Sequence, residues 1–453
     1  MQVFESSIEL PVSIEAAFAY HERPGALQRL IPPWENVVIE TSDQSLQPGS
    51  RVTLRSSIGG LPMRWIAEHR DYDPPHRFED VALSGPFHHW HHRHLFRALT
   101  ANSSLMTDRV EYQLPFGAMS RRLGGGYVRR QLEAMFAYRH RVTRSDLATA
   151  ARYSLSPMKI AITGAGGLLG SELSPFLSLL GHRSVPAQRS GEGAQTSFQL
   201  AANHRWDDCD VVIHLAGKSI AEQRWSESVK AQIRDSRVAP TRRLCQQLAE
   251  LSNPPKLLIC ASATGIYGDR GDELVDESSQ LGDDFLANVA AEWEAACDPA
   301  RQAGIRVVHL RLGVVLSPRG GALSSMLLPA RLGLGGPIGG GKQWWSWIAM
   351  DDVLGAIYHA IANDAVAGAM NAVAPTPVRN REFAADLGAV LGRPAFVPAP
   401  APVLRLALGQ MADDLLLSST RVEPGVLTAT GYDFRFTKLE PALRHLLGRS
   451  EKT

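Results

Sequence analysis

Cysteine is scarce in this chain, and no two cysteines lie close together in the sequence. The four cysteines, Cys209, Cys245, Cys260 and Cys297, form no C-x-x-C pair. This spacing excludes the dense disulfide framework of a small secreted domain and favours buried thiols in a reducing compartment.

An excess of charge of one sign is also absent. Lys and Arg number 47 and Asp and Glu 46, a net charge of +1 over 453 residues, and the basic residues are scattered. This balance gives no electrostatic reason to expect a nucleic acid or an anionic membrane as a partner.

The chain contains no long uninterrupted apolar run. Its most hydrophobic late stretch, 394–417, is broken by prolines, Arg405, Asp413 and Asp414. The first residues show no basic segment followed by an apolar one. We therefore expect a cytoplasmic protein with no membrane partner.

The first part of the chain has the patterns of an α+β domain. Apolar and polar residues alternate from Phe4 to Leu10, as in a half-buried strand, and Ser13 is placed to cap a helix. Further strand-like runs are expected at 51–55, 64–69, 78–83, 88–96 and 109–114. A helix is expected from Tyr127 to about Val142. This order predicts a curved antiparallel sheet around a long helix over residues 1–145, with an apolar cavity between them, and a linker over 146–157.

From residue 158, strands and helices alternate, which is typical of a parallel, doubly wound α/β sheet. We expect this domain to extend over 158–395, followed by a small helical subdomain over 396–450. Its first strand, Lys159–Thr163, leads into a glycine-rich loop and then a helix pattern. The loop consists of Gly164, Ala165, Gly166, Gly167, Leu168, Leu169 and Gly170. A glycine loop between a strand and a helix brings backbone N–H groups to a pyrophosphate, so it predicts a dinucleotide site; a turn without a ligand is the alternative.

The next strands indicate which dinucleotide is bound. Where an NAD site usually has an acidic residue, the chain has Arg189, and a guanidinium favours the 2′-phosphate of NADP. A solvated surface arginine is the alternative. Leu215, Ala216 and Gly217 follow a buried strand and are expected beside the cofactor. Arg237 is placed to reach the phosphates, although an exposed helical arginine fits its spacing equally well.

These motifs resemble the extended short-chain dehydrogenase/reductases of the nucleotide-sugar epimerase type. The resemblance rests on the glycine loop and on segments 214–217 and 261–268. Segments 230–237, 311–316, 333–339 and 343–348 are similar to the atypical, epimerase-like subgroup called the sugar nucleotide epimerase or cell-division inhibitor family. The resemblance implies a Rossmann fold and NADP contacts from the glycine loop, Arg189, Leu215, Ala216, Arg237 and Val315. Extended members often pair through helices, so it also implies a homodimer.

The first domain resembles the START-like, polyketide cyclase type of helix-grip domain. The residues that carry this likeness are 23–34 and 85–90. The resemblance implies a hydrophobic ligand in the N-terminal domain, and a purely structural domain is the alternative.

The catalytic pair of active reductases is missing. They use a tyrosine with a lysine four residues later, yet no tyrosine here has that lysine, and Phe285 and Val289 stand where the pair should fall. The remaining catalytic candidates are Tyr267, Ser262 and Thr264.

A polar and aromatic segment follows the glycine-rich loop 333–341. In the extended enzymes this region faces the substrate, so Lys342, Gln343, Trp344 and Trp345 are substrate candidates, with aromatic core packing as the alternative. The histidine-rich run 88–94 meets no metal-ligand spacing rule, and no metal is expected there.

Two functions stay open at this point. The first is an NADP(H)-binding, epimerase-like redox or isomerase enzyme that acts on an unknown small molecule without the Tyr–Lys pair. The second is a non-catalytic NADP(H)-dependent sensor or regulatory protein that binds a hydrophobic ligand through its N-terminal domain.

Overall fold

The chain divides into two compact units in its computed structural model, which describes residues 1–58, 61–115, 117–191, 195–201 and 204–450. The first unit comprises residues 1–156 with 175–182 and the end of the chain from His445. The second comprises residues 157–174 and 183–444.

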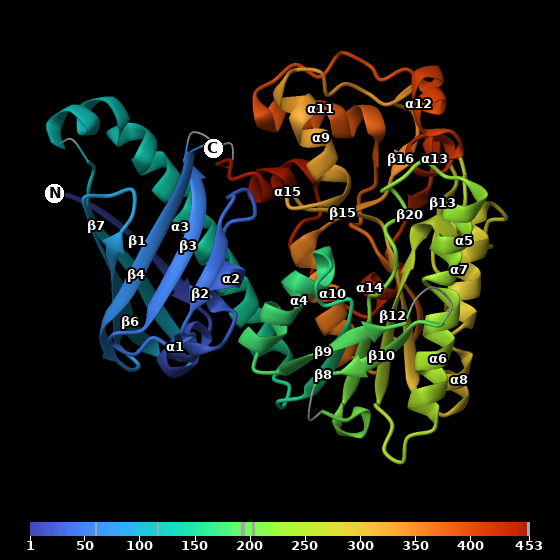
Figure 1. Cartoon of the computed structure of the whole chain (residues 1–453), viewed down its shortest axis with the longest axis horizontal. Helices are drawn as coiled ribbons and strands as arrows, with labels where there is room; N and C mark the ends of the chain where they lie inside the picture. The colour runs from blue at the N-terminus through green and yellow to red at the C-terminus, as the bar shows by residue number, and fades with distance from the viewer. Residues whose placement is uncertain (59–60, 116, 192–194, 202–203, 451–453) are drawn as a thin grey trace. The chain divides into compact units, whose positions relative to one another are not determined.

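The first unit is a seven-stranded antiparallel sheet with a long helix along it (Figure 1). The strand order is β1-β7-β6-β5-β4-β3-β2. The strands are β1 (Gln2–Leu10), β2 (Val38–Ser42), β3 (Arg51–Ile58), β4 (Leu61–Asp73), β5 (Arg77–Ser84), β6 (His89–Thr100) and β7 (Ser103–Gln113). The helices are α1 (Ile14–Glu22), α2 (Ala26–Leu30) and α3 (Gly117–Tyr153). The predicted α+β sheet-and-helix domain is confirmed.

Two local predictions in this unit need correction. The sequence did not indicate β2, because four of its five residues are exposed and it lacks a buried alternating face. Helix α3 begins before Tyr127 and runs to Tyr153, so residues 146–153 are helical rather than linker. Asp146 and Leu147 are buried, and this burial explains why the helix continues there.

The second unit is built on a seven-stranded sheet in the order β10-β9-β8-β11-β12-β14-β18. All neighbours are parallel except β10, which pairs antiparallel with β9 at the edge. The strands are β8 (Lys159–Thr163), β9 (Arg183–Ser190), β10 (Ser197–Leu200), β11 (Val211–His214), β12 (Leu257–Ala263), β14 (Arg306–Leu312) and β18 (Gly368–Ala372). The predicted doubly wound parallel sheet is confirmed.

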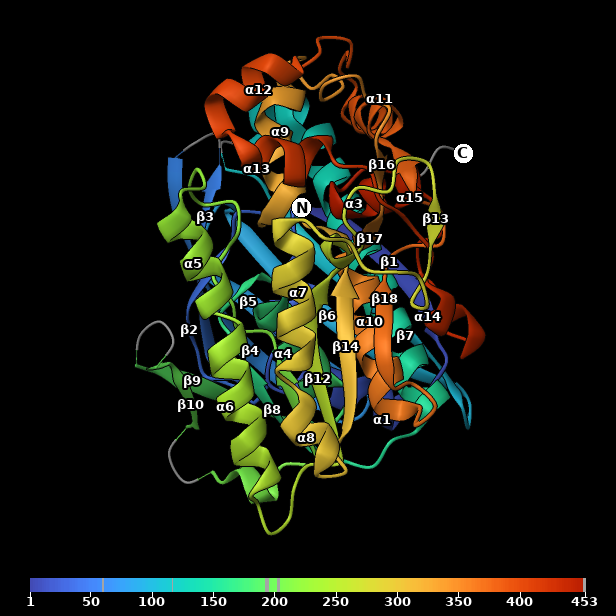
Figure 2. The ribbon, with the colours of Figure 1, turned by 90° about the vertical axis from the view of Figure 1, so that its right-hand side faces the viewer.

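Helices cover both faces of this sheet. In Figures 1 and 2, α6, α7 and α8 lie over one face and α4 and α10 over the other. These helices and the neighbouring α5 and α9 are α4 (Leu168–Leu179), α5 (Glu227–Asp235), α6 (Val238–Ala249), α7 (Phe285–Ala295), α8 (Asp298–Gln302), α9 (Gly321–Arg331) and α10 (Met350–Ala362). The buried strands between them form the core, with Ile160, Ile162, Val212, Ile213, Leu258 and Ile259 fully covered.

The last part of the second unit is mainly helical, as predicted. Its helices are α11 (Asn380–Leu391), α12 (Ala401–Leu408), α13 (Gln410–Ala412), a π-helical turn (Asp413–Leu417) and α14 (Gly425–Ala429). Helix α15 (Leu439–Leu446) ends the fold. Short strands complete the unit: β13 (Leu274–Val275), β15 (Val314–Leu316), β16 (Trp344–Trp345), β17 (Trp347–Ala349), β19 (Val378–Arg379) and β20 (Arg421–Val422). Among the described residues, no helix is both long and apolar enough to cross a bilayer.

Candidate functional site

The glycine loop turns tightly between β8 and α4. Gly164 has φ +71°, a backbone conformation that favours glycine, and a Cβ atom there would lie 2.9 Å from the carbonyl carbon of Leu215. The Gly167 N–H donates to the Gly164 carbonyl at 3.0 Å. The loop therefore lies directly against the chain that leaves β11, where Leu215 and Ala216 were predicted to flank the cofactor.

The last glycine of the loop has the tightest surroundings. A Cβ on Gly170 would lie 2.3 Å from the Gly164 carbonyl oxygen and 2.7 Å from the Ala165 Cα. Gly166 has no other atom within 4 Å of its Cβ position. Backbone packing thus explains Gly164 and Gly170, whereas Gly166 leaves space beside the loop, as a cradle for a dinucleotide requires.

A buried hydrogen-bonded histidine lies beneath the loop. His214, at the end of β11, is fully buried; its Nδ1 lies 2.7 Å from the Thr163 hydroxyl and its Nε2 lies 2.8 Å from the Thr241 hydroxyl. Burial lowers the pKa of His214 to about 4, so its imidazole is neutral at pH 7. These bonds hold the ends of β8 and β11 together under the glycine loop.

Acidification should destabilise the protein through His214. The unfolded chain takes up a proton near the ordinary histidine pKa of 6.5, whereas folded His214 does so only near 4. The stability this group contributes is therefore present above pH 6.5 and is lost as the pH falls toward 4, by about 2 kcal/mol between pH 7 and pH 4.5. Urea unfolding at both pH values should show that the loss is about 2 kcal/mol smaller for His214→Gln than for wild type. An equal loss in both proteins would assign the acid sensitivity to other groups.

Arg237 carries a partly buried positive charge at the junction of α5 and α6. Helix α5 ends at Asp235 and helix α6 begins at Val238, so Arg237 lies between two helices rather than inside one. Its guanidinium donates to the carbonyls of Ile233 (3.0 Å) and Lys218 (2.8 Å) and lies 5.1 Å from the centre of the Trp293 ring. A Cβ on Gly217 would lie 3.3 Å from its Cζ.

The Arg237 guanidinium has no carboxylate partner among the described residues. Desolvation alone lowers its pKa to about 10. A guanidinium in this setting gains most from an anion, and a phosphate matches its planar fork of donors. The surroundings of Arg237 therefore fit the predicted phosphate contact better than the alternative of an exposed helical arginine.

Arg189 lies just beyond the loop in the neighbouring strand. Thr163, the last residue of β8, pairs with Ala187 of β9, so Arg189 follows two residues later. Its side chain is exposed, and no hydrogen bond or ion pair to it is found in the described parts of the chain. In a Rossmann fold, a side chain at the end of this second strand contacts the adenosine ribose. The exposed guanidinium of Arg189 fits a 2′-phosphate at that position.

A second close approach to the loop comes from the turn after β15. Val315 is partly buried, and its carbonyl oxygen lies 3.8 Å from a Cβ built on Gly321. A Cβ on Gly320 would lie 3.2 Å from the Leu168 side chain. Val315 and Leu168, both predicted cofactor contacts, thus lie on either side of the turn at Gly320 and Gly321.

The three catalytic candidates sit in or beside a buried polar network. Tyr267 is fully buried; its hydroxyl donates to Asn371 Oδ1 at 2.7 Å and accepts from Arg311 at 2.9 Å. Ser262 donates to Glu294 at 2.7 Å. Burial raises the pKa of Tyr267, and this arrangement argues against Tyr267 as an acid or base.

The centre of this network is an ion pair that no sequence motif indicates. Arg311 on β14 donates to both carboxylate oxygens of Glu294 on α7, at 2.8 and 2.9 Å. No local pattern links these two residues, because a strand and a helix bring them together. Thr264 lies at the edge of the network, partly buried, with one long bond of 3.4 Å to the Leu312 carbonyl.

Apolar contacts occupy the position of the missing Tyr–Lys pair. Val289 is buried in α7. The Phe285 ring packs against the Trp225 ring, with 5.3 Å between the ring centroids. The ammonium of Lys230 lies 5.5 Å from the centre of the Phe285 ring.

The predicted substrate segment divides into core and surface residues. Gln343 is buried and donates to the Ile338 and Leu416 carbonyls, and Trp345 packs 5.3 Å from the Phe383 ring. These contacts favour core packing for both residues and argue against substrate contact.

The other two predicted substrate residues are more accessible. Lys342 is exposed. Trp344 is partly buried, donates to Asp272 at 2.9 Å, and has the guanidinium groups of Arg379 and Arg421 4.5 and 4.6 Å from its ring centre. Much of its ring is therefore already in contact with protein.

Family models match three consecutive parts of the chain. Residues 10–136 match the polyketide cyclase / dehydrase and lipid transport family, and residues 160–372 match the NAD dependent epimerase/dehydratase family. Residues 399–446 match a domain of unknown function, DUF1731. The first two matches agree with the resemblances of the two domains.

Similar proteins support the assignment of the second unit. An epimerase family protein of Mycobacterium tuberculosis is 38% identical over 296 residues, which cover 64% of this chain and 98% of the relative. The crystal structure of human epimerase family protein SDR39U1 with NADPH is 34% identical, with a TM-score of 0.58, and covers 64% of this chain and 99% of the human one.

One solved structure resembles the protein over almost its whole length. It is the nucleoside-diphosphate sugar epimerase from Corynebacterium glutamicum, with 34% identity and a TM-score of 0.79, and it covers 98% of this chain and 90% of that one. From the shared fold, glycine cradle and sequence, we conclude that the chain belongs to the NAD dependent epimerase/dehydratase family.

Proposed function

We propose that the second unit binds NADPH and that the protein carries out a redox or isomerisation reaction on a small molecule without a Tyr–Lys pair. The observation that carries the cofactor assignment is the partly buried Arg237 guanidinium, which has no carboxylate partner in the described chain and lies beside Gly217. The human relative crystallised with NADPH, which shares 34% of its residues with this chain, supports the same cofactor.

Each part of the cradle has a separate role in this proposal. The N–H groups of the glycine loop and the start of α4 hold the pyrophosphate, and Arg237 neutralises its charge. Arg189 pairs with the 2′-phosphate, and Val315 and Leu168 pack against the cofactor. NADPH, when bound, supplies a hydride that can be exchanged with a substrate carbon.

The proposed substrate contacts come from Thr264 and Lys342. The Thr264 hydroxyl is partly buried and only weakly bonded, and Lys342 is exposed, whereas Tyr267, Ser262, Gln343 and Trp345 have buried structural partners. We therefore infer that Thr264 orients the substrate oxygen.

The role of Arg189 can be tested by reversing its charge. Arg189→Glu should weaken NADPH binding about 10- to 100-fold, because a hydrogen bond to a charged group is worth about 1.5–3 kcal/mol. NADH binding should change little. Calorimetric titration with both cofactors measures the effect, and Arg183→Glu, at the other end of β9, is the matched control. Equal losses for NADPH and NADH would remove Arg189 from the phosphate site.

A second candidate function is a non-catalytic NADP(H) sensor. The apolar packing of Phe285 and Val289 and the fully bonded Tyr267 hydroxyl favour it. The two candidates differ in hydride transfer. NADPH deuterated at the reactive carbon is incubated with the protein and a panel of carbonyl compounds, and NADP⁺ is incubated with the protein and nucleoside-diphosphate sugars deuterated at the ring carbons that carry hydroxyl groups. Deuterium that moves between cofactor and substrate, or a sugar whose ring configuration changes, supports the enzyme, and tight binding without either result across both panels supports the sensor.

A further inference from the structure

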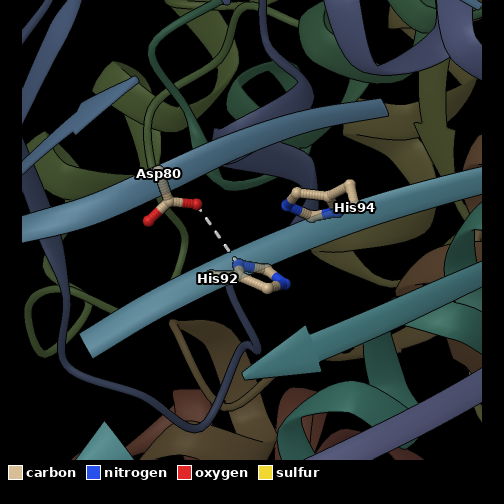
Figure 3. Close-up of side chains that lie close together, drawn as sticks. All are labelled: Asp80, His92 and His94. Carbon is tan, nitrogen blue, oxygen red and sulfur yellow. Dashed lines mark ion pairs between the residues drawn. The ribbon is translucent and has the colours of Figure 1, made fainter. Parts of the chain in front are cut away.

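Three side chains with metal-binding atoms meet inside the first unit (Figure 3). They are Asp80 on β5 and His92 and His94 on β6, and one ligand atom from each lies within 4.8 Å of the others. The Asp80 Oδ2 is 3.3 Å from His92 Nδ1. His92 is almost fully buried, and its ring packs 5.3 Å from the Phe136 ring of α3, so the group faces the helix rather than solvent.

The strand register explains why these residues meet. Asp80 is the direct cross-strand partner of His92, and His94 follows two residues later on the same face of β6. The side chains of His91 and Glu79 lie on the opposite face of the same two strands. There His91 Nε2 lies 2.6 Å from the Glu79 carboxylate. The histidine run thus separates into two independent groups, one on each face.

A buried carboxylate on β7 orients both imidazoles of the inner group. Asp108 Oδ1 lies 3.0 Å from His92 Nε2 and 2.7 Å from His94 Nδ1. The other oxygen, Oδ2, lies 2.6 Å from His140 Nε2 on α3. His92 therefore has one ring nitrogen at Asp108 and the other at Asp80. Metal-binding histidines are typically held in this way, with the second nitrogen on a carboxylate.

The spacing and the chemistry both suit a transition metal. Bonds of about 2.0–2.2 Å in a tetrahedral site separate neighbouring ligand atoms by about 3.3–3.6 Å, which matches the distance between Asp80 and His92. In Figure 3 a ring nitrogen of His94 faces the same space as the Asp80 carboxylate. Two imidazoles and one carboxylate are the ligands that zinc and ferrous iron take in proteins while keeping at least one position open.

An unsatisfied nitrogen next to the group adds an independent observation. Within the described chain, His69 Nδ1 is buried without a hydrogen bond of acceptable geometry. His69 is the cross-strand partner of Asp80 on β4, so this nitrogen belongs to the same region. Buried polar atoms without partners are uncommon, and a bound ion that reorganises the group accounts for this one.

Contrary to the expectation from sequence spacing alone, we propose that Asp80, His92 and His94 bind a divalent first-row transition-metal ion, with Asp108 as the positioning residue that holds both imidazoles. The three protein ligands leave a coordination position for an oxygen atom of water or of a small molecule. This proposal is independent of cofactor binding in the second unit.

The test is metal titration of the full-length protein after treatment with a chelator. Co²⁺ should bind with a stoichiometry of one, with the visible absorption of a nitrogen- and oxygen-ligated ion, and Zn²⁺ should displace it. Asp80→Asn and His94→Gln should each weaken binding at least about tenfold. His91→Gln, on the opposite face of the same strand, is the matched control and should bind as wild type does.

Two results would overturn the proposal. One is wild-type protein that binds neither Co²⁺ nor Zn²⁺ at micromolar concentrations. The other is a loss of metal affinity in His91→Gln as large as that in His94→Gln. Such a loss would place the ion on the face of the strands that carries His91 and Glu79. Circular dichroism identifies a variant that does not fold. If both inner-face variants fail, the Co²⁺ stoichiometry and absorption of the wild type decide the question.

Discussion

Gly170→Ala is expected to abolish NADPH binding, with a Kd at least about 100-fold higher than that of the wild type. A Cβ at this position would lie 2.3 Å from the Gly164 carbonyl oxygen and 2.7 Å from the Ala165 Cα. Both atoms belong to the backbone, so the loop must shift as a whole rather than one side chain rotating away. Overpacking of this kind costs about 1–3 kcal/mol of stability, and the shift moves the N–H groups proposed to hold the pyrophosphate.

Gly166→Ala is the matched control for this substitution. It lies in the same loop, and its Cβ position has no other atom within 4 Å. Calorimetric titration with NADPH should show a much smaller loss of affinity for Gly166→Ala than for Gly170→Ala. Thermal unfolding should show a lower Tm than that of the wild type only for Gly170→Ala. Wild-type affinity in folded Gly170→Ala would show that the loop does not hold the cofactor.

Arg237→Met is expected to weaken the binding of NADPH and the binding of NADH by similar factors, about 10- to 100-fold. The reason is that the pyrophosphate is common to both cofactors, and a hydrogen bond to a charged group is worth about 1.5–3 kcal/mol. Arg189→Glu should instead discriminate between the two cofactors. The two substitutions together therefore separate a contact to the pyrophosphate from a contact to the 2′-phosphate.

Arg234→Met provides the control for Arg237. Arg234 lies three residues before Arg237 in the sequence and is exposed. Its guanidinium forms an ion pair with Glu292 Oε2 at 2.7 Å. An exposed pair of this kind contributes little, so this variant should bind both cofactors as wild type does. Equal effects of Arg234→Met and Arg237→Met on cofactor affinity would count against a specific phosphate contact by Arg237.

Local sequence patterns predicted much of the fold because they arise from short-range physics. The alternation in β1, the capping Ser13 and the strand–glycine loop–helix motif each depend on neighbouring residues. The edge strands β2 and β10 escaped prediction because a strand with little buried surface carries no strong alternation. The extent of α3 depends on the burial of Asp146 and Leu147, which only the tertiary structure reveals.

The proposed cofactor site could be argued from the sequence more directly than the chemistry could. The glycine spacing and Arg189 fit what a pyrophosphate and a 2′-phosphate require. The hydrogen bonds of the Tyr267 hydroxyl, in contrast, are made with Arg311 and Asn371. These residues lie far from Tyr267 in the sequence, and only the folded sheet brings them into contact with it. The Asp80, His92 and His94 group depends on strand register in the same way, because the sequence alone does not say which residue of β5 faces which residue of β6.

Calorimetric titration of the purified full-length protein with NADPH and with NADH tests the central claim most directly. Arg237 and Arg189 as separate phosphate partners predict tight, stoichiometric binding of NADPH and clearly weaker binding of NADH. Absence of binding for both cofactors, or tighter binding of NADH, would contradict the assignment of the glycine loop and its two arginines as an NADPH site.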